Sequence, residues 1–536
     1  MKAGWNLANR SFLKGALVLS VSGIFIKIIG ALYRIPLARL IGAEGMALYQ
    51  KAYPIYGILL ALSTAGFPLA ISILVAEKHA FGDYQGGRRI LRLSLTILSG
   101  LALFFTIFLI FSAKWLAVDI LDDARVYYGL IAVSPAILLA TVSSCFRGYF
   151  QGNQTMNPTA ISQTLEQIVR VTTILLLAYL LFPMGLEFSA AGAVFGAVTG
   201  SAAAVAVLLA TYRKHKKTYA TKLNTFVQKQ ESVPLILKRI AILAIPVSIG
   251  GLVTPIMQTI DAVLIPSRLQ IAGYTKKIAD EFFGQFSGMA NTLVNIAPII
   301  TLSISVALIP IISEAMAKKD RRTLNYRINQ ALWSTFLIGF PASAGLWVLA
   351  TPICDLLYKQ PEVGPLVAVL APSTLLFGLY QTTRATLQGM GKTYLPVVNL
   401  VAGIIVKGTL NYLLVAIPFL GINGAGIATF AAFTVAVVLN FHYIKKYTDF
   451  IMDWKKNITL PIVSTTIMTI ITGLIYRLSL PLIGNGLAVM LAILAGVTSF
   501  SIAILVTGGI KAQDLRTIPG IGAKLGDRLE RFKLLR

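Results

Sequence analysis

Long apolar runs separated by short polar segments extend along the whole chain. The runs are continuous rather than alternating, and a helix needs about 20 such residues to cross a hydrocarbon core about 30 Å thick. Because lipid offers no hydrogen-bond partners, runs of this kind form helices, which satisfy their own backbone groups. The pattern predicts fourteen membrane-spanning helices, near residues 13–38, 46–75, 90–113, 126–147, 160–183, 189–211, 236–263, 283–313, 328–350, 364–387, 394–418, 423–444, 458–478 and 484–507.

The composition agrees with an integral membrane protein. The chain has 536 residues, of which 56% are hydrophobic and 13% are charged, and its mean hydropathy is +0.77. Ordinary globular domains contain about 45–50% apolar residues. We therefore expect an all-α polytopic membrane protein.

The net charge of +26 raises the question of a nucleic-acid partner. If the N-terminus is cytoplasmic, most of the 47 Lys and Arg fall in inner loops and tails, as the positive-inside rule describes. This distribution predicts a multi-pass membrane protein with both termini in the cytoplasm and with contacts to anionic lipids. The C-terminal LRTIPGIGAKLGDRL imitates a DNA-binding hairpin turn, but an amphipathic helix on anionic lipid explains it equally, and we expect no nucleic-acid partner.

The chain contains an internal repeat with one constant offset. At a shift of 237 residues, FRGYFQGNQT lies over TRATLQGMGKT, which aligns Arg147 with Arg384, and the same shift aligns Pro135 with Pro372. The Gly-Lys-Thr of LQGMGKT resembles the end of a phosphate-binding loop, but position 386 is Thr386, where that loop needs glycine, and no strand precedes it. The segment is therefore interpreted as a cytoplasmic turn, and no nucleotide or other cofactor is expected.

An even number of helices separates the repeated elements, so both copies enter the membrane in the same orientation. We predict two six-helix lobes related by a pseudo-twofold axis along the membrane normal, with a further C-terminal helix pair. Transporters built in this way bind substrate between the lobes and expose it to each side in turn. A transporter is thus favoured over an enzyme or a channel. The predicted parts are an N-lobe (1–211), a basic cytoplasmic linker (212–235), a C-lobe (236–444), the final helix pair (445–507) and a basic cytoplasmic tail (508–536).

Two basic residues of the first apolar run are candidates for a substrate cavity. A charge in the bilayer costs several kcal/mol unless it faces water, a partner or substrate. Lys27 and Arg34 are two helical turns apart and share a face with Gly23 and Gly30. A cationic stripe beside small residues suits an aqueous cavity, although Arg34 could instead extend toward the membrane surface.

A second pair of embedded bases occupies equivalent places in the two repeats. Arg170 lies one turn beyond Glu166, and the repeat places it over Lys407. We expect Arg170 and Lys407 to contact substrate. The alternative is a structural ion pair, in which Glu166 neutralises Arg170 within its helix.

Acidic residues supply candidate partners. Asp261 lies in an apolar span, where it either pairs with Lys27 or Arg34 or binds a coupling cation. No pattern predicts a metal site. Charged residues of the inner loops and turns are candidate cytoplasmic gate contacts, or ordinary loop salt bridges: Glu77, Asp83, Glu314, Asp320, Arg147 and Arg384.

Four segments carry a family resemblance: YRIPLARLIGAEGMALYQ, STAGFPLAISILVAEKHAFGD, FRGYFQGNQTMNPTAISQTLEQIVR and ITLSISVALIPIISEAMAKKD. They resemble the stage V sporulation protein B branch of the multidrug, oligosaccharidyl-lipid and polysaccharide (MOP) exporter superfamily, which is similar to lipid II flippases. The resemblance spans nearly the whole chain and implies a central basic cavity for a lipid-linked diphosphate. It also implies that the last two helices form a groove for the polyprenyl tail.

By position, Lys27, Arg34 and Arg170 match basic sites of that family's first lobe. The chain departs from the pattern in FFGQFSGMANTLVNIAP, which lacks an arginine that some lipid II flippases carry there. The resemblance implies a flippase of the bacterial plasma membrane that moves undecaprenyl-pyrophosphate-linked lipid II from the inner to the outer leaflet by alternating access. We expect a monomer. Membrane potential is the expected driving force, because moving a negatively charged diphosphate out of an inside-negative cell is favourable. The alternatives are an exporter of another lipid-linked polysaccharide unit, or a drug or cation antiporter of the same superfamily.

Overall fold

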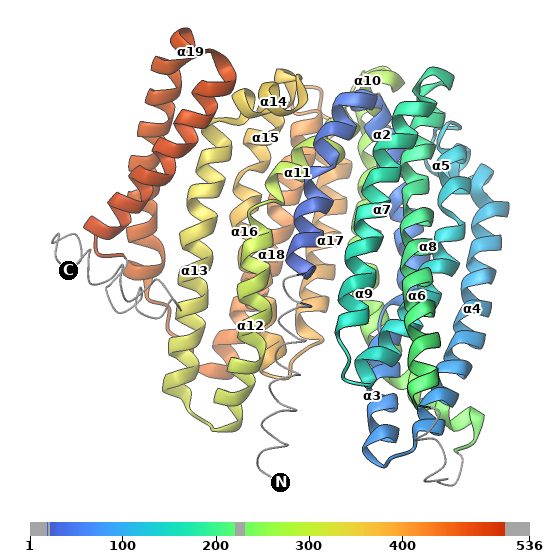
Figure 1. The fold of residues 1–536 in the computed structure, drawn as a ribbon. Coiled ribbons are helices and arrows are strands. Elements are labelled where there is room, and N and C mark those ends of the chain that lie inside the picture. The colour runs from blue at the N-terminus through green and yellow to red at the C-terminus, as the bar shows by residue number, and fades with distance from the viewer. Residues whose placement is uncertain (1–18, 20–21, 220–230, 510–536) are drawn as a thin grey trace. The chain divides into compact units, whose positions relative to one another are not determined.

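The computed structural model describes residue 19 and residues 22–219 and 231–509, and every regular element in these ranges is a helix (Figure 1). The chain forms two compact units: unit 1 is Met1–Gly288 and unit 2 is Met289–Arg536. The predicted tail lies outside the described residues from position 510 onward, as do residues 220–230 of the predicted linker.

Unit 1 begins with a helical stretch from Ser22 that continues into α2. Gly42 interrupts α2 with a φ of 67°, between the first two predicted spans, and Gly66 separates α2 from α3. The elements of unit 1 are α2 (Arg34–Thr64), α3 (Phe67–Ala80), α4 (Tyr84–Trp115), η1 (Leu116–Ile120), α5 (Val126–Val133), α6 (Pro135–Gly152), α7 (Asn157–Leu181), η2 (Phe182–Met184), α8 (Leu186–Tyr219), α9 (Val233–Ile271), α10 (Lys276–Gly284) and most of η4 (Gln285–Ala290).

Unit 2 ends in a long element, α19, which Gly484 interrupts with a φ of 73°. Its elements after η4 are α11 (Asn291–Val294), α12 (Pro298–Ala317), α13 (Arg321–Val348), α14 (Ala350–Tyr358), η5 (Pro361–Val363), α15 (Gly364–Leu370), α16 (Pro372–Gly389), α17 (Leu395–Leu414), α18 (Ile422–Thr448), η6 (Lys455–Thr459) and α19 (Leu460–Val506).

The described residues contain 11 candidate membrane spans, or 12 if the bent pair Pro361–Leu370 and Pro372–Gly389 counts as one. Two of these, Ser22–Ala80 and Lys455–Val506, have 59 and 52 residues, and each contains one of the interrupting glycines. Each is long enough for two crossings at about 20 residues per crossing. The all-α membrane fold is confirmed, whereas the count of fourteen stays a prediction.

The helix boundaries repeat at the offset found in the sequence. α6 and α16 span equivalent residues, and both begin with proline in the first turn. A side chain at Gly152 of α6 would meet the carbonyl oxygen of Ser72 at 2.7 Å, and one at Gly389 of α16 would meet that of Ile309 at 2.9 Å. These partners are themselves equivalent positions, so the glycines of FQGNQ and LQGMG allow the same close helix crossing in both copies.

The division between the two units differs from the predicted lobe boundary at 212–235. α9 packs against α2 and α3, and α10 packs against α2, so both belong to unit 1. The two compact units therefore do not coincide with the two sequence repeats, because α9 belongs to unit 1 although the repeat assigns it to the second copy. The predicted lobe ranges stay a prediction.

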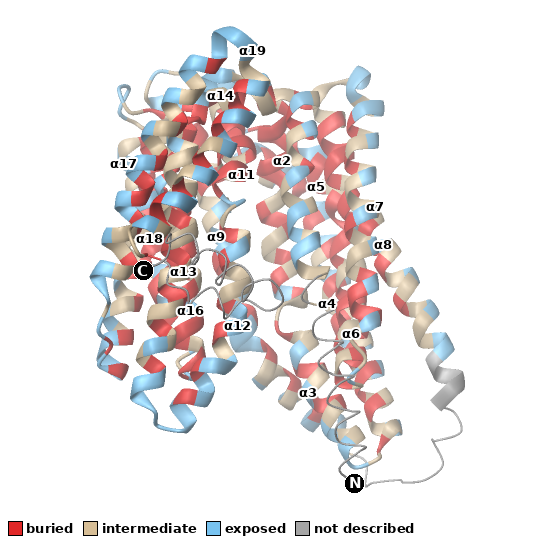
Figure 2. Ribbon diagram, turned by 60° about the vertical axis from the view of Figure 1, so that its left-hand side comes forward, coloured by how far each residue is buried: buried red, intermediate tan, exposed pale blue. Residues whose placement is uncertain are grey.

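The core of unit 1 holds α6 and α7 in place. α6 packs against α3, α4 and α8, and buried residues run along much of its length (Figure 2). Its side chains Phe146 and Phe150 are buried with Ile71 and Leu208. α7 packs along α8 (Figure 1), where a side chain at Gly200 would meet the Glu166 carbonyl oxygen at 2.8 Å. Small residues permit such close helix pairing in membranes. The backbone of α7 behind Glu166 is thereby fixed against α8.

Candidate functional site

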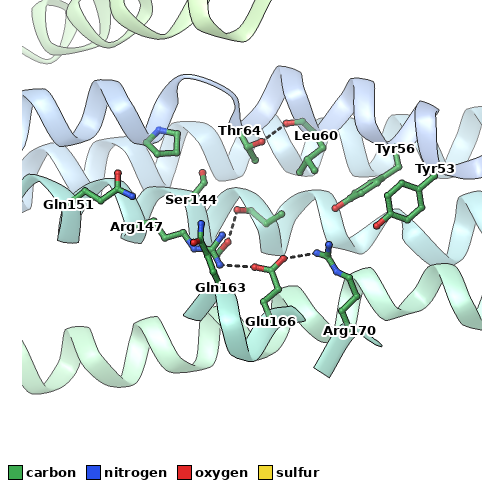
Figure 3. Close-up of a pocket in the computed structure, with 13 residues that line it drawn as sticks. Tyr53, Tyr56, Leu60, Thr64, Ser144, Arg147, Gln151, Gln163, Glu166 and Arg170 are labelled. Carbon is green, nitrogen blue, oxygen red and sulfur yellow. Dashed lines mark hydrogen bonds and ion pairs between the residues drawn. The ribbon is translucent and has the colours of Figure 1, made fainter. Parts of the chain in front are cut away.

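A pocket of about 380 Å³ lies inside unit 1, among α2, α6 and α7 (Figure 3). Its volume falls in the range of about 300–1,000 Å³ that is typical of small-ligand sites. Most of its lining is polar or aromatic, which is unusual inside an apolar helical unit. The lining consists of Tyr53, Tyr56, Leu60, Thr64, Pro68, Ala140, Ser143, Ser144, Arg147, Gln151, Gln163, Glu166 and Arg170.

Three charged side chains meet in this pocket. Glu166 accepts a hydrogen bond from Arg147 at 2.6 Å through one carboxylate oxygen, and from Arg170 at 2.6 Å through the other (Figure 3). Arg147 also donates to the hydroxyl of Ser162 at 3.2 Å. The acid therefore links α6 to α7 and leaves the trio with a net positive charge.

Aromatic side chains of α2 form another wall of the pocket. Tyr53 and Tyr56 are lining residues on the α2 side (Figure 3), and their ring centroids are 5.7 Å apart in an edge-to-face arrangement. Tyr49, one turn earlier, lies 5.3 Å from Tyr53 and shares a hydrogen bond of 2.9 Å with Tyr33. Sequence analysis did not single out these tyrosines, although their spacing of three or four residues places them on one helical face.

The four predicted cavity bases have different environments. Arg170 lines the pocket, whereas Lys27 and Arg34 are not among its lining residues. Lys27 is exposed and Arg34 is half-buried. Lys407 belongs to α17 of unit 2 and is only 3% exposed. Within unit 1 the structure brings Arg170 together with Arg147. A shared role for the four predicted bases stays a prediction.

The acid Glu166 makes the intrahelical pair that the sequence offered as an alternative, and it also binds Arg147. Arg147 lines the pocket, and its predicted role as a cytoplasmic gate contact stays a prediction. Its repeat counterpart Arg384 is exposed near the end of α16. Asp261 is buried in α9, and its pairing or coupling role stays a prediction.

The other predicted gate residues of unit 1 make ion pairs and a helix cap. Glu77 pairs with Arg239, which also contacts Glu231 at 3.3 Å. Asp83 caps α4 by accepting from the Gly86 N–H at 2.7 Å. Glu77 and Arg239 lie on α3 and α9, and Asp83 precedes α4. A gating role for Glu77 and Asp83 stays a prediction.

In unit 2 the corresponding acids are more exposed. Glu314 pairs with Lys318 at 2.5 Å. Asp320 caps α13, and the hydrogen bonds it accepts from the Thr323 side chain and backbone lower the pKa of its carboxyl group. Asp83 and Asp320 therefore perform the same capping role in equivalent positions of the repeat.

A buried charge cluster at the α2–α10 end of unit 1 was missed by the sequence analysis. The Lys51 ammonium lies 2.5 Å from the Asp280 carboxylate and 3.5 Å from that of Asp123. Arg125 binds Asp123 at 3.1 Å and Glu44 at 2.5 Å, and lies 3.6 Å from Asp280. The local signal was a lysine within an apolar run, because its two partners, Asp123 and Asp280, come from distant segments.

The two aspartates of this cluster respond differently to their surroundings. Burial raises the pKa of Asp280, and the positive charge of Lys51 opposes this only in part. Burial also acts to raise the pKa of Asp123, but hydrogen bonds from Arg125 and the charge of Lys51 outweigh it, so that this pKa is lowered. Asp123 is thus held ionised by its neighbours.

Metal binding has no support in the described ranges, where no group of three or more His, Cys, Asp or Glu side chains is placed to hold an ion. The chemistry available in the pocket is instead that of guanidinium groups, amides and phenols. Arginine binds carboxylate and phosphate oxygens through paired N–H donors. The site is suited to binding an anion.

Comparison with known proteins gives the family. The family described as "Polysaccharide biosynthesis protein" matches residues 12–316, and the MatE family matches residues 287–413. Stage V sporulation protein B of Bacillus subtilis (strain 168) is 33% identical to this chain, over 96% of the chain and 99% of its own length. Lipid II flippase MurJ of the same strain is 30% identical, over 82% of this chain and 83% of its own length.

A solved structure agrees at the level of the fold. Lipid II flippase MurJ in an inward closed conformation aligns with a TM-score of 0.67 at 16% identity, covering 91% of this chain and 98% of that one. The chain therefore belongs to the polysaccharide biosynthesis protein family and is a multi-pass membrane transporter of the MOP superfamily.

Proposed function

We propose that this transporter is a flippase that moves an undecaprenyl-pyrophosphate-linked peptidoglycan precursor, lipid II, from the inner to the outer leaflet by alternating access. The observation that carries the proposal is the pair Arg147 and Arg170, brought together in a pocket within a membrane-spanning unit. Embedded bases are retained where they contact water, a partner or substrate. Their number and chemistry suit a diphosphate, whose oxygens accept paired hydrogen bonds from guanidinium groups.

The relatives support the same substrate class. One relative that covers 82% of the chain is named a lipid II flippase, and another, which covers 96%, is a sporulation protein. Lys27 and Arg34 lie on the helical stretch that precedes and begins α2, and we propose that they guide the headgroup toward the pocket. The proposal also includes a monomer with both termini in the cytoplasm and with anionic lipids at its basic inner loops.

Membrane potential is the proposed driving force. Moving a negatively charged diphosphate out of an inside-negative cell is favourable by about 2.3 kcal/mol per charge per 100 mV. The same field would draw a positively charged, unloaded site back toward the inside. Flipping in vesicles should therefore slow when the potential is dissipated at constant pH, and an unchanged rate would refute this part of the proposal.

A second candidate is an exporter of another undecaprenyl-linked saccharide. It is favoured by FFGQFSGMANTLVNIAP, which lacks the arginine that some lipid II flippases carry there. Both candidates need the same diphosphate site, so they differ only in the saccharide. Competition between lipid II and other lipid-linked saccharides in a flipping assay separates them. A drug or cation antiporter would instead rely on buried acids and would not need the paired arginines.

Complementation tests the proposed function. A strain depleted of its own lipid II flippase should grow when it expresses this chain, and Arg34→Ala or Arg170→Ala should abolish rescue while the protein remains in the membrane. Arg321→Ala is the matched control, because Arg321 is exposed and makes only a surface pair with Asp449. Absence of rescue by the unaltered chain at normal membrane levels would refute the lipid II assignment. Full rescue by both site variants would refute the assignment of the site.

A further inference from the structure

The carboxylate of Glu166 lies between the two arginines that line the pocket. Of the described residues that line the pocket, three are charged, and Glu166 is the acid among them. One of its oxygens accepts from Arg147 and the other from Arg170, each at 2.6 Å. The carboxylate thus bridges two guanidinium groups from two helices in the way that two phosphate oxygens would (Figure 3).

We propose that Glu166 is an internal stand-in for the substrate diphosphate, which displaces it from Arg147 and Arg170. The inference rests on the proposed function, because it concerns the same site, and it deepens that function by naming the residue that competes with substrate. A carboxylate carries one negative charge and a diphosphate carries more. The diphosphate can therefore replace the acid at both arginines, whereas a neutral or cationic molecule cannot.

The arginines retain donors for an incoming ligand. A guanidinium has five N–H donors, and Glu166 uses one from each arginine. The Nε of Arg170 is buried, and no hydrogen-bond acceptor lies within reach among the described residues. A buried donor without an acceptor costs free energy. The two arginines therefore keep N–H donors that the carboxylate does not use and that a displacing diphosphate could engage.

The remaining lining fits a small, strongly polar anion. Gln151 and Gln163 bring amide donors, and Tyr53 and Tyr56 bring phenolic hydroxyls. A volume of about 380 Å³ is in the range for a small ligand. The pocket is thus large enough and polar enough to hold the diphosphate group of the substrate.

Calorimetric titration with inorganic pyrophosphate tests the proposal. The affinities of the wild type, Glu166→Gln and Glu166→Asp are compared, each as the purified full-length chain in nanodiscs. Gln removes the competing charge, so we expect its affinity for pyrophosphate to rise by at least about tenfold. Asp is one methylene shorter and holds two arginines less well, so a smaller rise is expected. Glu362→Gln is the matched control, because Glu362 is exposed in η5 of unit 2, and its affinity should equal that of the wild type.

Further variants test whether the gain in pyrophosphate affinity arises in this pocket. Arg147→Ala and Arg170→Ala, each added to Glu166→Gln, should abolish the gain, which shows that it arises in this pocket. If Glu166→Gln does not fold, the test rests on Glu166→Asp. Weaker pyrophosphate binding by Glu166→Asp than by the wild type would contradict the proposal that the carboxylate competes with the ligand. Equal or weaker pyrophosphate binding by a folded Glu166→Gln would overturn the proposal, because it would mean that Glu166 only positions the arginines.

The experiment also separates this inference from the proposed function. Tighter pyrophosphate binding without lipid II flipping supports the stand-in role and points to a different diphosphate substrate. Lipid II flipping without tighter binding supports the proposed function and overturns the stand-in role. Repeating the titration with undecaprenyl diphosphate in the nanodisc distinguishes a lipid-linked diphosphate from the free anion, since only a lipid-linked substrate should bind more tightly than pyrophosphate.

Discussion

Lys51 holds two buried carboxylates together, and its replacement by methionine is the most informative change for the stability of unit 1. Its side chain is 1% exposed, and those of Asp280 and Asp123 are 2% and 4% exposed. Methionine keeps much of the side-chain length and removes the charge. In Lys51→Met, Asp280 loses its contact of 2.5 Å and retains only Arg125, at 3.6 Å, as a basic neighbour.

The expected loss of stability follows from this geometry. Removing one partner of a buried ion pair costs about 3–5 kcal/mol, because the other charge stays buried without compensation. Arg125 still compensates part of the negative charge, so we expect the lower end, about 3 kcal/mol. For a unit of this size, 1 kcal/mol corresponds to roughly 2 °C in Tm, which gives a decrease of about 6 °C.

Thermal unfolding of the purified protein in detergent, at one fixed scan rate, measures this change. The control is Lys276→Met, because Lys276 forms a surface pair with Asp122, whose side chain is 62% exposed, and such pairs contribute about 0–1 kcal/mol. Adding Asp280→Asn to Lys51→Met should restore part of the lost Tm, since it removes the uncompensated charge. If Lys51→Met melts no lower than Lys276→Met, this reasoning about the buried cluster is wrong.

Three further predictions concern stability. Asp83→Ala removes the cap of α4 at the Gly86 N–H and should lower stability by about 1 kcal/mol in the same thermal assay, whereas Asp83→Asn should lose less. Asn440→Leu removes the buried acceptor of the Asn399 amide, which lies 2.8 Å away, so it should lower the free energy of unfolding by about 1–3 kcal/mol. Adding Asn399→Leu should recover part of this loss, because it removes the unpaired donor. The pKa of Asp123 is lower in the folded protein than its unfolded value of about 3.9. The ionised carboxylate therefore stabilises the fold above that unfolded value, and this stability is lost as the pH falls through the folded pKa. Asp123→Asn should remove this loss, so that its Tm-against-pH curve is flatter below about pH 4.

The repeat and the membrane helices were predictable because their signals are local or periodic. Apolar runs of helical length need no tertiary information, and one constant offset identified α6 and α16 as equivalent before their bounds were known. The pair between Glu166 and Arg170 was also accessible, because residues four apart on a helix face each other.

The rest of the site depends on helix packing, which has no local signature. Arg147 reaches Glu166 because α6 and α7 pack against each other, and this pairing across two helices could not be predicted from the position of Arg147 in the sequence. Lys51 and Asp280 are 229 residues apart and belong to no shared motif. The boundary of unit 1 could not be predicted from the sequence either, because α9 belongs to this unit through its packing against α2 and α3 and not through the repeat.

The measurement that tests the central claim most directly is the flipping of labelled lipid II by the purified chain in vesicles with an imposed potential. Arg147 and Arg170 should be required, so the wild type should move the lipid faster than protein-free vesicles do, and the doubly substituted Arg147→Ala/Arg170→Ala protein should stay at that background. A folded double variant that flips as fast as the wild type, or a wild type no faster than protein-free vesicles, would contradict the account.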